Sequence, residues 1–226
     1  YEDLGLFTAD EQVGRDLTRL FNELSGYAIE KKYKRLLVAP RYLRKGLLKL
    51  IATETKNALA GKPSGIRLKL NSIVDEAIID ALYQASMAGV PIDLVVRGIC
   101  SLVPGREGLS ETIRVRSVLG RYLEHSRIFS FHNDGDPQVY IGSADMMHRN
   151  LDRRIEALIR LSDPAHIAQI DELFERHLHD EAASWHLHPD GTWQRHHLDG
   201  ASGDLDDVQN GLMKSIADRR RSPKKR

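Results

Sequence analysis

Apolar and polar positions alternate along the first half of the chain in a way that predicts three strands and two helices. Short apolar runs at 35–39, 66–70 and 92–96 have the length of strands, and IRLKL at 66–70 alternates as a strand with one polar face does. Between these runs, residues 41–60 and 75–87 carry apolar residues at helical spacing, and a glycine follows each segment. Strands that alternate with helices in this order favour a parallel sheet with helical crossovers.

The remaining segments predict further helices and strands around this unit. Thr8 and Glu11 fit a capping box for a helix that runs to about Leu24. Beyond a loop at 98–111, the expected elements are a helix near 112–124, strands at 128–131, 138–141 and 154–161, a helix from Asp163 to about Ala183, and a short hairpin within 184–197. Residues beyond Gly200 are mostly polar, and we expect weak order there. The whole pattern predicts an α/β fold with a mixed, largely parallel sheet flanked by helices.

The composition excludes several classes of protein. With 41% hydrophobic and 29% charged residues, the chain is neither wholly disordered nor fibrous. No apolar run approaches the roughly 18 residues that cross a membrane, and the start of the chain has no signal-peptide pattern. The single cysteine, Cys100, excludes an internal disulfide and a cysteine-cluster zinc site, which suits a reducing cytoplasm. Because the chain does not begin with methionine, we expect it to be part of a longer polypeptide.

Positive charge is concentrated at one end of the chain. The net charge is +1, yet residues 219–226 hold six basic residues and no acidic ones, so the rest of the chain is mildly acidic. An acidic body argues against a general nucleic-acid-binding protein, and we expect no DNA partner. The basic end suits a solubilising tail or contact with a polyanion, and we favour the tail.

Arginine is in excess in the segment that follows the third strand. Arg97 comes directly after the strand at 92–96, where open α/β sheets place ligand contacts. Against three glutamates, the arginines of this segment are Arg97, Arg106, Arg114, Arg116, Arg121 and Arg127. This excess suits an anionic ligand with planar oxygens, above all phosphate, and it equally suits a solvated helix face.

His125 is the residue of this segment best suited to phosphoryl chemistry. It lies two residues before Arg127, so both side chains project to one face of the strand that begins there. Gly142, Ser143 and Asp145 follow the next strand, and they can bring backbone amides and polar side chains to the same edge. Histidine exchanges protons, or holds a phosphoryl group, near neutral pH.

Six further histidines gather toward the end of the chain without predicting a metal site. They are His177, His179, His186, His188, His196 and His197. Their spacing is too local to define a zinc shell, and the chain has no H-E-x-x-H motif. We therefore predict no metal ligands within this chain.

Several strings in the sequence resemble known families. HSR at 125–127, followed by GSAD at 142–145, is similar to the H-x-K … G-S-x-N/D signature of the phospholipase D superfamily, with Arg127 where lysine usually stands. Longer strings, among them YEDLGLFTAD, SVLGRYLEHSRI and VYIGSADMMHRNLDRRIE, resemble the C-terminal region of bacterial polyphosphate kinases of the long-chain-synthesising type. This resemblance covers residues 1–195. Met146 stands where many members have an aromatic residue, and methionine can fill the same space.

The resemblance implies a phospholipase D-like fold and a kinase activity. It implies reversible transfer of the terminal phosphoryl group of ATP to inorganic polyphosphate through a phosphohistidine. That histidine and the Mg²⁺ ligands would lie upstream of this chain, so the chain alone should be inactive. Residues 1–30 would end the preceding domain and link it to a second phospholipase D-like domain at 31–197, with a poorly ordered basic tail at 198–226. The partners implied are ATP or ADP, polyphosphate and further copies of the enzyme, in the cytoplasm or at the membrane periphery.

The resemblance also assigns roles to four residues. His125 matches the second domain's histidine, which contacts the nucleotide phosphates, and Arg97 matches an arginine that binds ATP phosphate. Tyr1 matches a tyrosine that packs on the nucleotide base, and Asp3 matches an acidic residue near the phosphorylated histidine. When protonated, His125 would donate to the bridging or leaving oxygen as a general acid.

Two further phosphate contacts are predicted from the residues alone. Arg127 and Arg149 have the charge and the position to approach the same anion. For Arg149, a salt bridge to Asp145 or Asp152 is an equal alternative.

Two other functions stay open at this point. A phospholipase D-like phosphodiesterase would use His125 on a phosphodiester, but such enzymes pair two motifs and this chain shows one, so a homodimer would have to supply the second. A non-catalytic module for polyanion binding or oligomerisation would use the basic end and show strong salt dependence. The longer strings favour the kinase over both.

Overall fold

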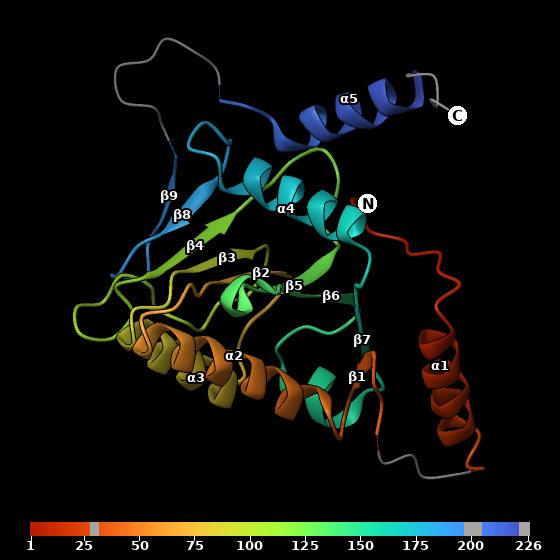
Figure 1. Ribbon diagram of the computed structural model, residues 1–226. Helices are drawn as coiled ribbons and strands as arrows, with labels where there is room; N and C mark the ends of the chain where they lie inside the picture. Colours follow the sequence, from red (N-terminus) through yellow and green to blue (C-terminus); the bar gives the residue numbers. More distant parts are fainter. Residues whose placement is uncertain (28–31, 197–204, 222–226) are drawn as a thin grey trace.

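One mixed sheet organises the molecule. The computed structural model describes residues 1–27, 32–196 and 205–221, and within them nine strands form one sheet in the order β1-β7-β6-β5-β2-β3-β4-β8-β9 (Figure 1). The strands are β1 Leu36–Val38, β2 Ile66–Leu70, β3 Ile92–Val96, β4 Ile113–Ser117, β5 Arg127–Phe131, β6 Gln138–Gly142, β7 Ala157–Arg160, β8 Trp185–Leu187 and β9 Trp193–Arg195. The α-helices are α1 Glu11–Leu24, α2 Leu43–Leu59, α3 Glu76–Met87, α4 Pro164–Leu178 and α5 Val208–Arg221.

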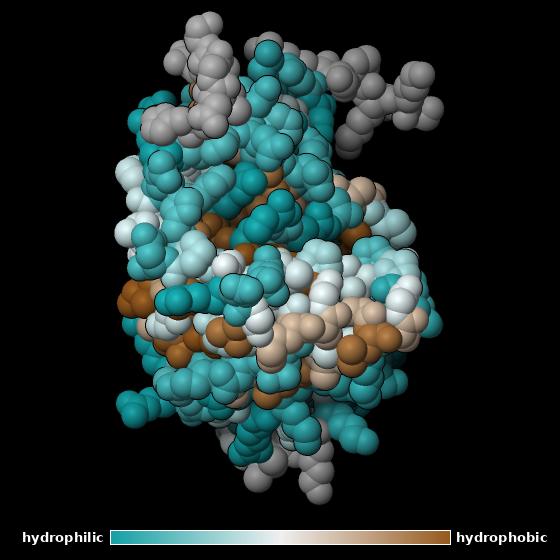
Figure 2. Space-filling model, turned by 90° about the vertical axis from the view of Figure 1, so that its left-hand side faces the viewer, coloured by the Kyte–Doolittle hydropathy of each residue, from teal (hydrophilic) through white to brown (hydrophobic). Residues whose placement is uncertain are grey.

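Helices cover both faces of the sheet. α2 and α3 lie together against one face, and α4 crosses the other face with α5 beyond it (Figure 1). Along β5 and β6, side chains alternate between the two layers: Phe129 and Tyr140 join the core under α2 and α3, whereas Ile128 and Ile141 join the core under α4. Seen from one side in Figure 2, apolar residues form a band between hydrophilic upper and lower parts.

The α/β class and the mixed sheet are confirmed, but the sheet is not largely parallel. Only β2–β3 and β3–β4 are parallel, and the other six pairings of the described strands are antiparallel. A tight turn at Asn133–Gly135 joins β5 to β6, and such a turn reverses the chain. The β-α-β rhythm of the first half therefore does not continue into the second.

The helix predicted near 112–124 is wrong. Residues 113–117 form β4, in which the buried Ile113 and Val115 alternate with Arg114 and Arg116. This period of two outweighs the helical spacing of the flanking residues. Arg114 also lies opposite Asp93 of β3 and donates to its carboxylate at 2.7 Å, which stabilises the strand pairing.

The expectation of weak order beyond residue 200 is wrong for residues 208–221, which form α5. Val208 and Leu212 pack with Val118 and Ala182 in a small apolar cluster. Val208 and Leu212, at positions i and i+4, lie on one face of the helix and dock it against the sheet side. Among the described residues, no helix is both long and apolar enough to cross a bilayer.

A buried carboxylate fastens α1 to the sheet. The helix is capped by Asp10, not by Thr8 as the sequence suggests. Inside the helix, Asp16 is fully buried and accepts hydrogen bonds from the backbone N–H groups of Lys34 (2.7 Å) and Arg35 (2.6 Å), which precede β1. The carboxylate thus satisfies donors at the start of the outer strand.

We predict that Asp16→Ala lowers the free energy of unfolding by about 1–3 kcal/mol, because buried N–H groups lose their acceptor. Urea denaturation measures this change. The matched control is Asp80→Ala on the exposed side of α3, which should stay within about 0.5 kcal/mol of the parent. Equal effects of the two substitutions would contradict the anchoring role of Asp16.

Candidate functional site

The candidate site lies along one edge of the sheet. β2, β3 and β6 end at this edge, and β5, which runs the opposite way to β2 and β6, begins there. Arg97 directly follows β3, Arg127 opens β5, and Asp145 comes shortly after β6. His125 precedes β5 by two residues, so the topology gathers the predicted positions at one edge.

The first residues of the chain bring two more predicted residues to His125. The backbone N–H of Glu2 donates to the carbonyl of Leu123 at 2.8 Å, and the N–H of His125 donates to the carbonyl of Glu2 at 2.9 Å. This short bridge lets the Asp3 carboxylate reach Nδ1 of His125 at 2.7 Å. The Tyr1 ring meets the imidazole edge-on, with ring centroids 5.3 Å apart. Tyr1, Asp3 and His125 therefore form one contact group.

The charge of Asp3 fixes the orientation of His125. Partial burial would raise the pKa of the Asp3 carboxyl, but the hydrogen bond to His125, the backbone N–H of Leu4 and the charges of His125 and Arg127 outweigh it and lower that pKa. Asp3 is therefore ionised at neutral pH and holds the Nδ1–H of His125. Nε2 is left as the ring nitrogen available to a ligand.

Arg127 connects the chain segments that meet at this edge through hydrogen bonds. Its guanidinium donates to the carbonyl of His125 at 2.6 Å and to the Asp145 carboxylate at 3.2 Å. The same carboxylate accepts from the backbone N–H groups of Asn71 (2.8 Å) and Ser72 (3.3 Å). Arg127 thus links the segment before β5 to the ends of β2 and β6, and its predicted contact with phosphate stays a prediction.

Arg97 differs from Arg127 because its guanidinium is not fully paired. Its Nε is buried and has no hydrogen-bond partner among the described residues. A buried donor without an acceptor costs about 1–3 kcal/mol. The Nε has almost no accessible surface, so only the terminal nitrogens of this guanidinium could meet a ligand, and the contact of Arg97 with ATP phosphate stays a prediction.

Arg149 lies apart from the ion pairs of the edge. It is exposed and opens a π-helical turn, Arg149–Arg153. Neither of the two salt bridges considered for it appears among the described residues: Asp145 pairs with Arg127, and Asp152 pairs with Arg44 at 2.5 Å. Its phosphate contact stays a prediction.

For two charged side chains at this edge, Lys69 and Glu156, the sequence does not indicate that they are buried. Lys69 was expected on a polar strand face, yet its side chain is only 2% exposed and lies against Glu2 and Glu124. Glu156 is also buried, and its carboxylate accepts from the Ser143 hydroxyl and from the Asn150 amide. The partners of Lys69 are distant in sequence, and Asn150, a partner of Glu156, lies on an irregular turn, so local periodicity could not find them.

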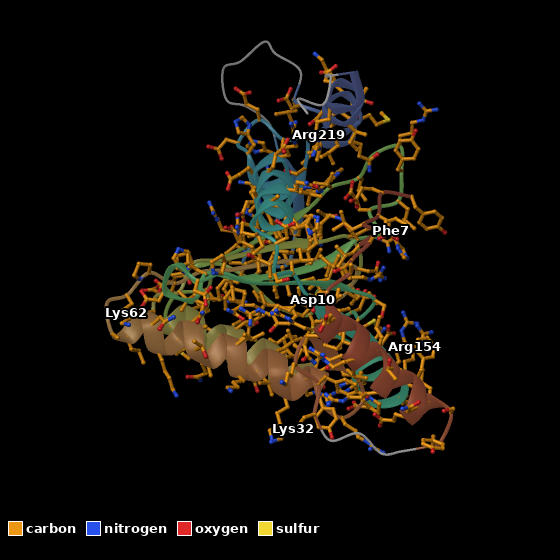
Figure 3. All side chains as sticks on the ribbon, turned by 45° about the vertical axis from the view of Figure 1, so that its right-hand side comes forward. Phe7, Asp10, Lys32, Lys62, Arg154 and Arg219 are labelled. Carbon is orange, nitrogen blue, oxygen red and sulfur yellow. The ribbon has the colours of Figure 1, made fainter. Side chains whose placement is uncertain are left out.

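An apolar cleft of about 1140 Å³ opens beside Tyr1 and Asp3. Its walls are the N-terminal segment on one side and α4 and α5 on the other, and Tyr122 also lines it. Figure 3 shows these walls at the labelled Phe7 and, above it, the labelled Arg219 of α5. Two tyrosine rings in such a cleft offer flat apolar faces to an aromatic base.

The histidines near the end of the chain have separate surroundings. His177 is fully buried beside Glu124, and His186 stacks on His196 with ring centroids 4.7 Å apart. His179 lies near Glu181 and Asp206 in an exposed group, one of two described groups with metal-ligand spacing. The other is Asp75, Glu76 and His148, in which Arg44 already occupies Asp75. His197 lies outside the described residues.

Comparisons with known proteins agree on one family. The sequence model of a family described as Polyphosphate kinase C-terminal domain 2 matches residues 36–204. Polyphosphate kinase of Streptomyces coelicolor is 59% identical over 220 residues, which are 97% of this chain and 30% of the relative. The relative of the same name from Mycobacterium tuberculosis is 50% identical over 227 residues, with 99% and 30% covered.

A solved structure gives the same result. The crystal structure of polyphosphate kinase from Porphyromonas gingivalis matches with a TM-score of 0.89 and 36% identity, over 96% of this chain and 33% of that one. The chain therefore spans about a third of the length of the relatives that it matches.

The environment of His186 predicts a pH dependence of stability. Burial, the charge of Arg116 and the neighbouring His196 and His188 lower the pKa of His186 from 6.5 to about 4. The unfolded chain therefore binds a proton at His186 more readily than the folded chain does. The stability that neutral His186 contributes is present above pH 6.5 and is lost as the pH falls toward 4.

Urea denaturation midpoints of the parent should fall over this pH range more steeply than those of His186→Gln. The control is His179→Gln, which changes an exposed ring. Parallel profiles for the parent and His186→Gln would contradict the prediction.

Proposed function

The chain belongs to the polyphosphate kinase family, and we propose that it forms the nucleotide-phosphate half of that family's catalytic site. The reaction is reversible transfer of the terminal phosphoryl group of ATP to inorganic polyphosphate, through a phosphohistidine that a domain outside this chain supplies. The observation that carries the proposal is the Asp3–His125 pair at 2.7 Å, which orients a histidine at the sheet edge beside Tyr1. Arg97, which directly follows β3, adds a positive charge at the same edge.

The proposed mechanism relies on position and charge. Phosphoryl transfer requires little covalent chemistry from the protein beyond alignment and neutralisation of the transferring group. Arg97 donates to a non-bridging phosphate oxygen, on which charge accumulates during transfer. His125, with Nδ1 held by Asp3, donates from Nε2 to the bridging or leaving oxygen as a general acid. Tyr1 packs on the base at the mouth of the apolar cleft. Arg127 holds the segment before β5 in place through its hydrogen bonds to the His125 carbonyl and the Asp145 carboxylate.

Magnesium is assigned to the part of the enzyme outside this chain. The carboxylates of Asp3 and Asp145 at this edge do not fit a magnesium site, because Asp3 binds the imidazole of His125 and Asp145 binds Arg127 and two backbone N–H groups. Mg²⁺ prefers carboxylate and phosphate oxygens that are free to coordinate it. No step of this mechanism therefore passes through a metal ligand of this chain.

The wider setting follows from the family. We propose that residues 1–30 link the phosphohistidine-bearing domain to a second catalytic domain at 31–197. ATP or ADP and polyphosphate are its partners, and the complete enzyme works as a homo-oligomer in the cytoplasm or at the membrane periphery. The relatives' length, about three times that of this chain, supports a site shared between domains.

Calorimetric titration of Mg-ATP into the chain tests the proposed site. We predict that Arg97→Ala weakens binding by about 10- to 100-fold, the value of a charge-assisted hydrogen bond, and that His125→Ala weakens it by about tenfold. The matched control is Arg106→Ala, which removes an exposed arginine from the loop after β3. Saturable binding that neither Arg97→Ala nor His125→Ala weakens would place the nucleotide elsewhere and contradict the proposal.

A second prediction concerns turnover. The isolated chain should form no ATP from ADP and polyphosphate, because it supplies only part of the site. A hybrid in which it replaces the matching third of the Streptomyces coelicolor relative should be active. In that hybrid, His125→Ala should lower kcat by about 10²- to 10⁴-fold, the usual contribution of a general acid. ATP formation by the isolated chain, or a fully active His125→Ala hybrid, would contradict this division of roles.

A further inference from the structure

A buried cluster of charged side chains lies beside the segment that carries His125. Its centre is Lys69 on β2, whose ammonium lies 2.8 Å from the Glu2 carboxylate, 2.9 Å from Glu124 and 2.7 Å from the Ser126 hydroxyl. The ammonium group donates hydrogen bonds to Glu2 and Ser126, and Glu124 faces it as a second counter-ion. The Lys69 and Glu124 side chains are only 2% and 3% exposed.

The cluster extends from Lys69 to α4 and α5. Glu124 also meets Nε2 of His177 at 3.1 Å, and Nδ1 of that ring meets the carbonyl of Leu173 at 2.8 Å. The Gln209 amide of α5 donates to Glu124 at 2.7 Å. Burial would raise the pKa of Glu124, but His177, Lys69 and Gln209 outweigh it and lower that pKa. Lys69 and the His177 ring thus face the carboxylates of Glu2 and Glu124 inside one cluster.

Stability alone does not account for such a cluster. Removing several charges from water is costly, and apolar side chains of similar volume often stabilise a core as well or better. What the cluster provides is a fixed position for the chain segments on either side of His125. Glu124 and Ser126 flank His125, and Glu2 lies between Tyr1 and Asp3, so one ammonium group holds both halves of the contact group described above.

We propose that Lys69 is a positioning residue: by holding Glu2, Glu124 and Ser126 together, it sets Tyr1 and Asp3 against His125. The backbone bridge between residues 2 and 123–125 brings these segments side by side. Lys69 fixes where the two segments lie relative to β2 and therefore to the sheet edge. This role depends on the proposed function only in the claim that the assembled group binds nucleotide.

The decisive variant is the double substitution Lys69→Met with Glu2→Gln. It removes one cation and one anion together, so the net charge of the cluster is unchanged and Glu124 keeps its contacts with His177 and Gln209. The main-chain groups of the backbone bridge are unchanged, so a lost ring contact reports the loss of the Lys69 anchor and not of the bridge. NMR on the chain should then show loss of the nuclear Overhauser contact between the Tyr1 and His125 rings. The pKa of the Asp3 carboxyl should rise toward 3.8, because its bond to His125 is lost. Mg-ATP binding should weaken by at least about tenfold.

Two controls accompany this variant. Lys69→Arg keeps the charge and several donors, and it should retain the ring contact and most of the affinity. Lys62→Met removes a lysine that pairs with Asp134 and lies far from the labelled Phe7 of the N-terminal segment (Figure 3), and it should change neither readout.

The outcomes separate the positioning role from the proposed function. A folded double variant that keeps the ring contact and the lowered pKa of Asp3 would overturn the positioning role. Loss of the contact with unchanged affinity for Mg-ATP would support that role and contradict the nucleotide site instead. If the double variant does not fold, Glu2→Ala decides, because it alters only the N-terminal anchor: loss of the ring contact supports the proposal, and an intact contact overturns it.

Discussion

The antiparallel pairing of β5 with β2 is the constraint on which the site depends. The register sets Lys69 opposite Ile128, so the start of β5 lies beside the end of β2. Because β2 and β3 run parallel, the segment that follows β3 reaches the same edge. A parallel β5 would have placed its first residues at the far edge of the sheet, away from Arg97. The mixed sheet is therefore what brings the histidine and the arginine to one edge.

The cations at this edge divide into two kinds. Lys69 and Arg127 are paired with carboxylates and hold backbone segments in place. Arg97 has a buried Nε without a partner among the described residues, and Arg149 is exposed. Ion pairs in a low-dielectric interior fix geometry at a cost, whereas an arginine without a carboxylate partner keeps a positive charge that attracts an incoming anion. A preorganised edge of this kind suits phosphoryl transfer, in which the protein contributes mainly alignment and charge.

Local pattern was sufficient for part of the fold and insufficient for the rest. The bounds of β2 follow from its alternation of apolar and basic residues, and those of β3 follow from a short apolar run that is buried on both faces of the sheet. The helix expected at 112–124 was wrong because Ile113 and Val115 alternate with Arg114 and Arg116, and because β3 and β8 pair with this segment on its two sides. α5 was missed because few of its residues are apolar.

For the site, the motif pointed to His125, Arg127 and Asp145. Tyr1 and Asp3 came only from the family resemblance, because no local sequence rule joins two residues that are 122 positions apart.

The central claim is that His125 and Arg97 meet the phosphates of a nucleotide. The most direct measurement is an NMR titration of Mg-ADP into the chain labelled with ¹⁵N in its histidine and arginine side chains. The account predicts that His125 Nε2 and Arg97 Nε shift together with one dissociation constant, while His186, on the far strand β8, stays unmoved. Saturable binding that leaves His125 and Arg97 unmoved would contradict it.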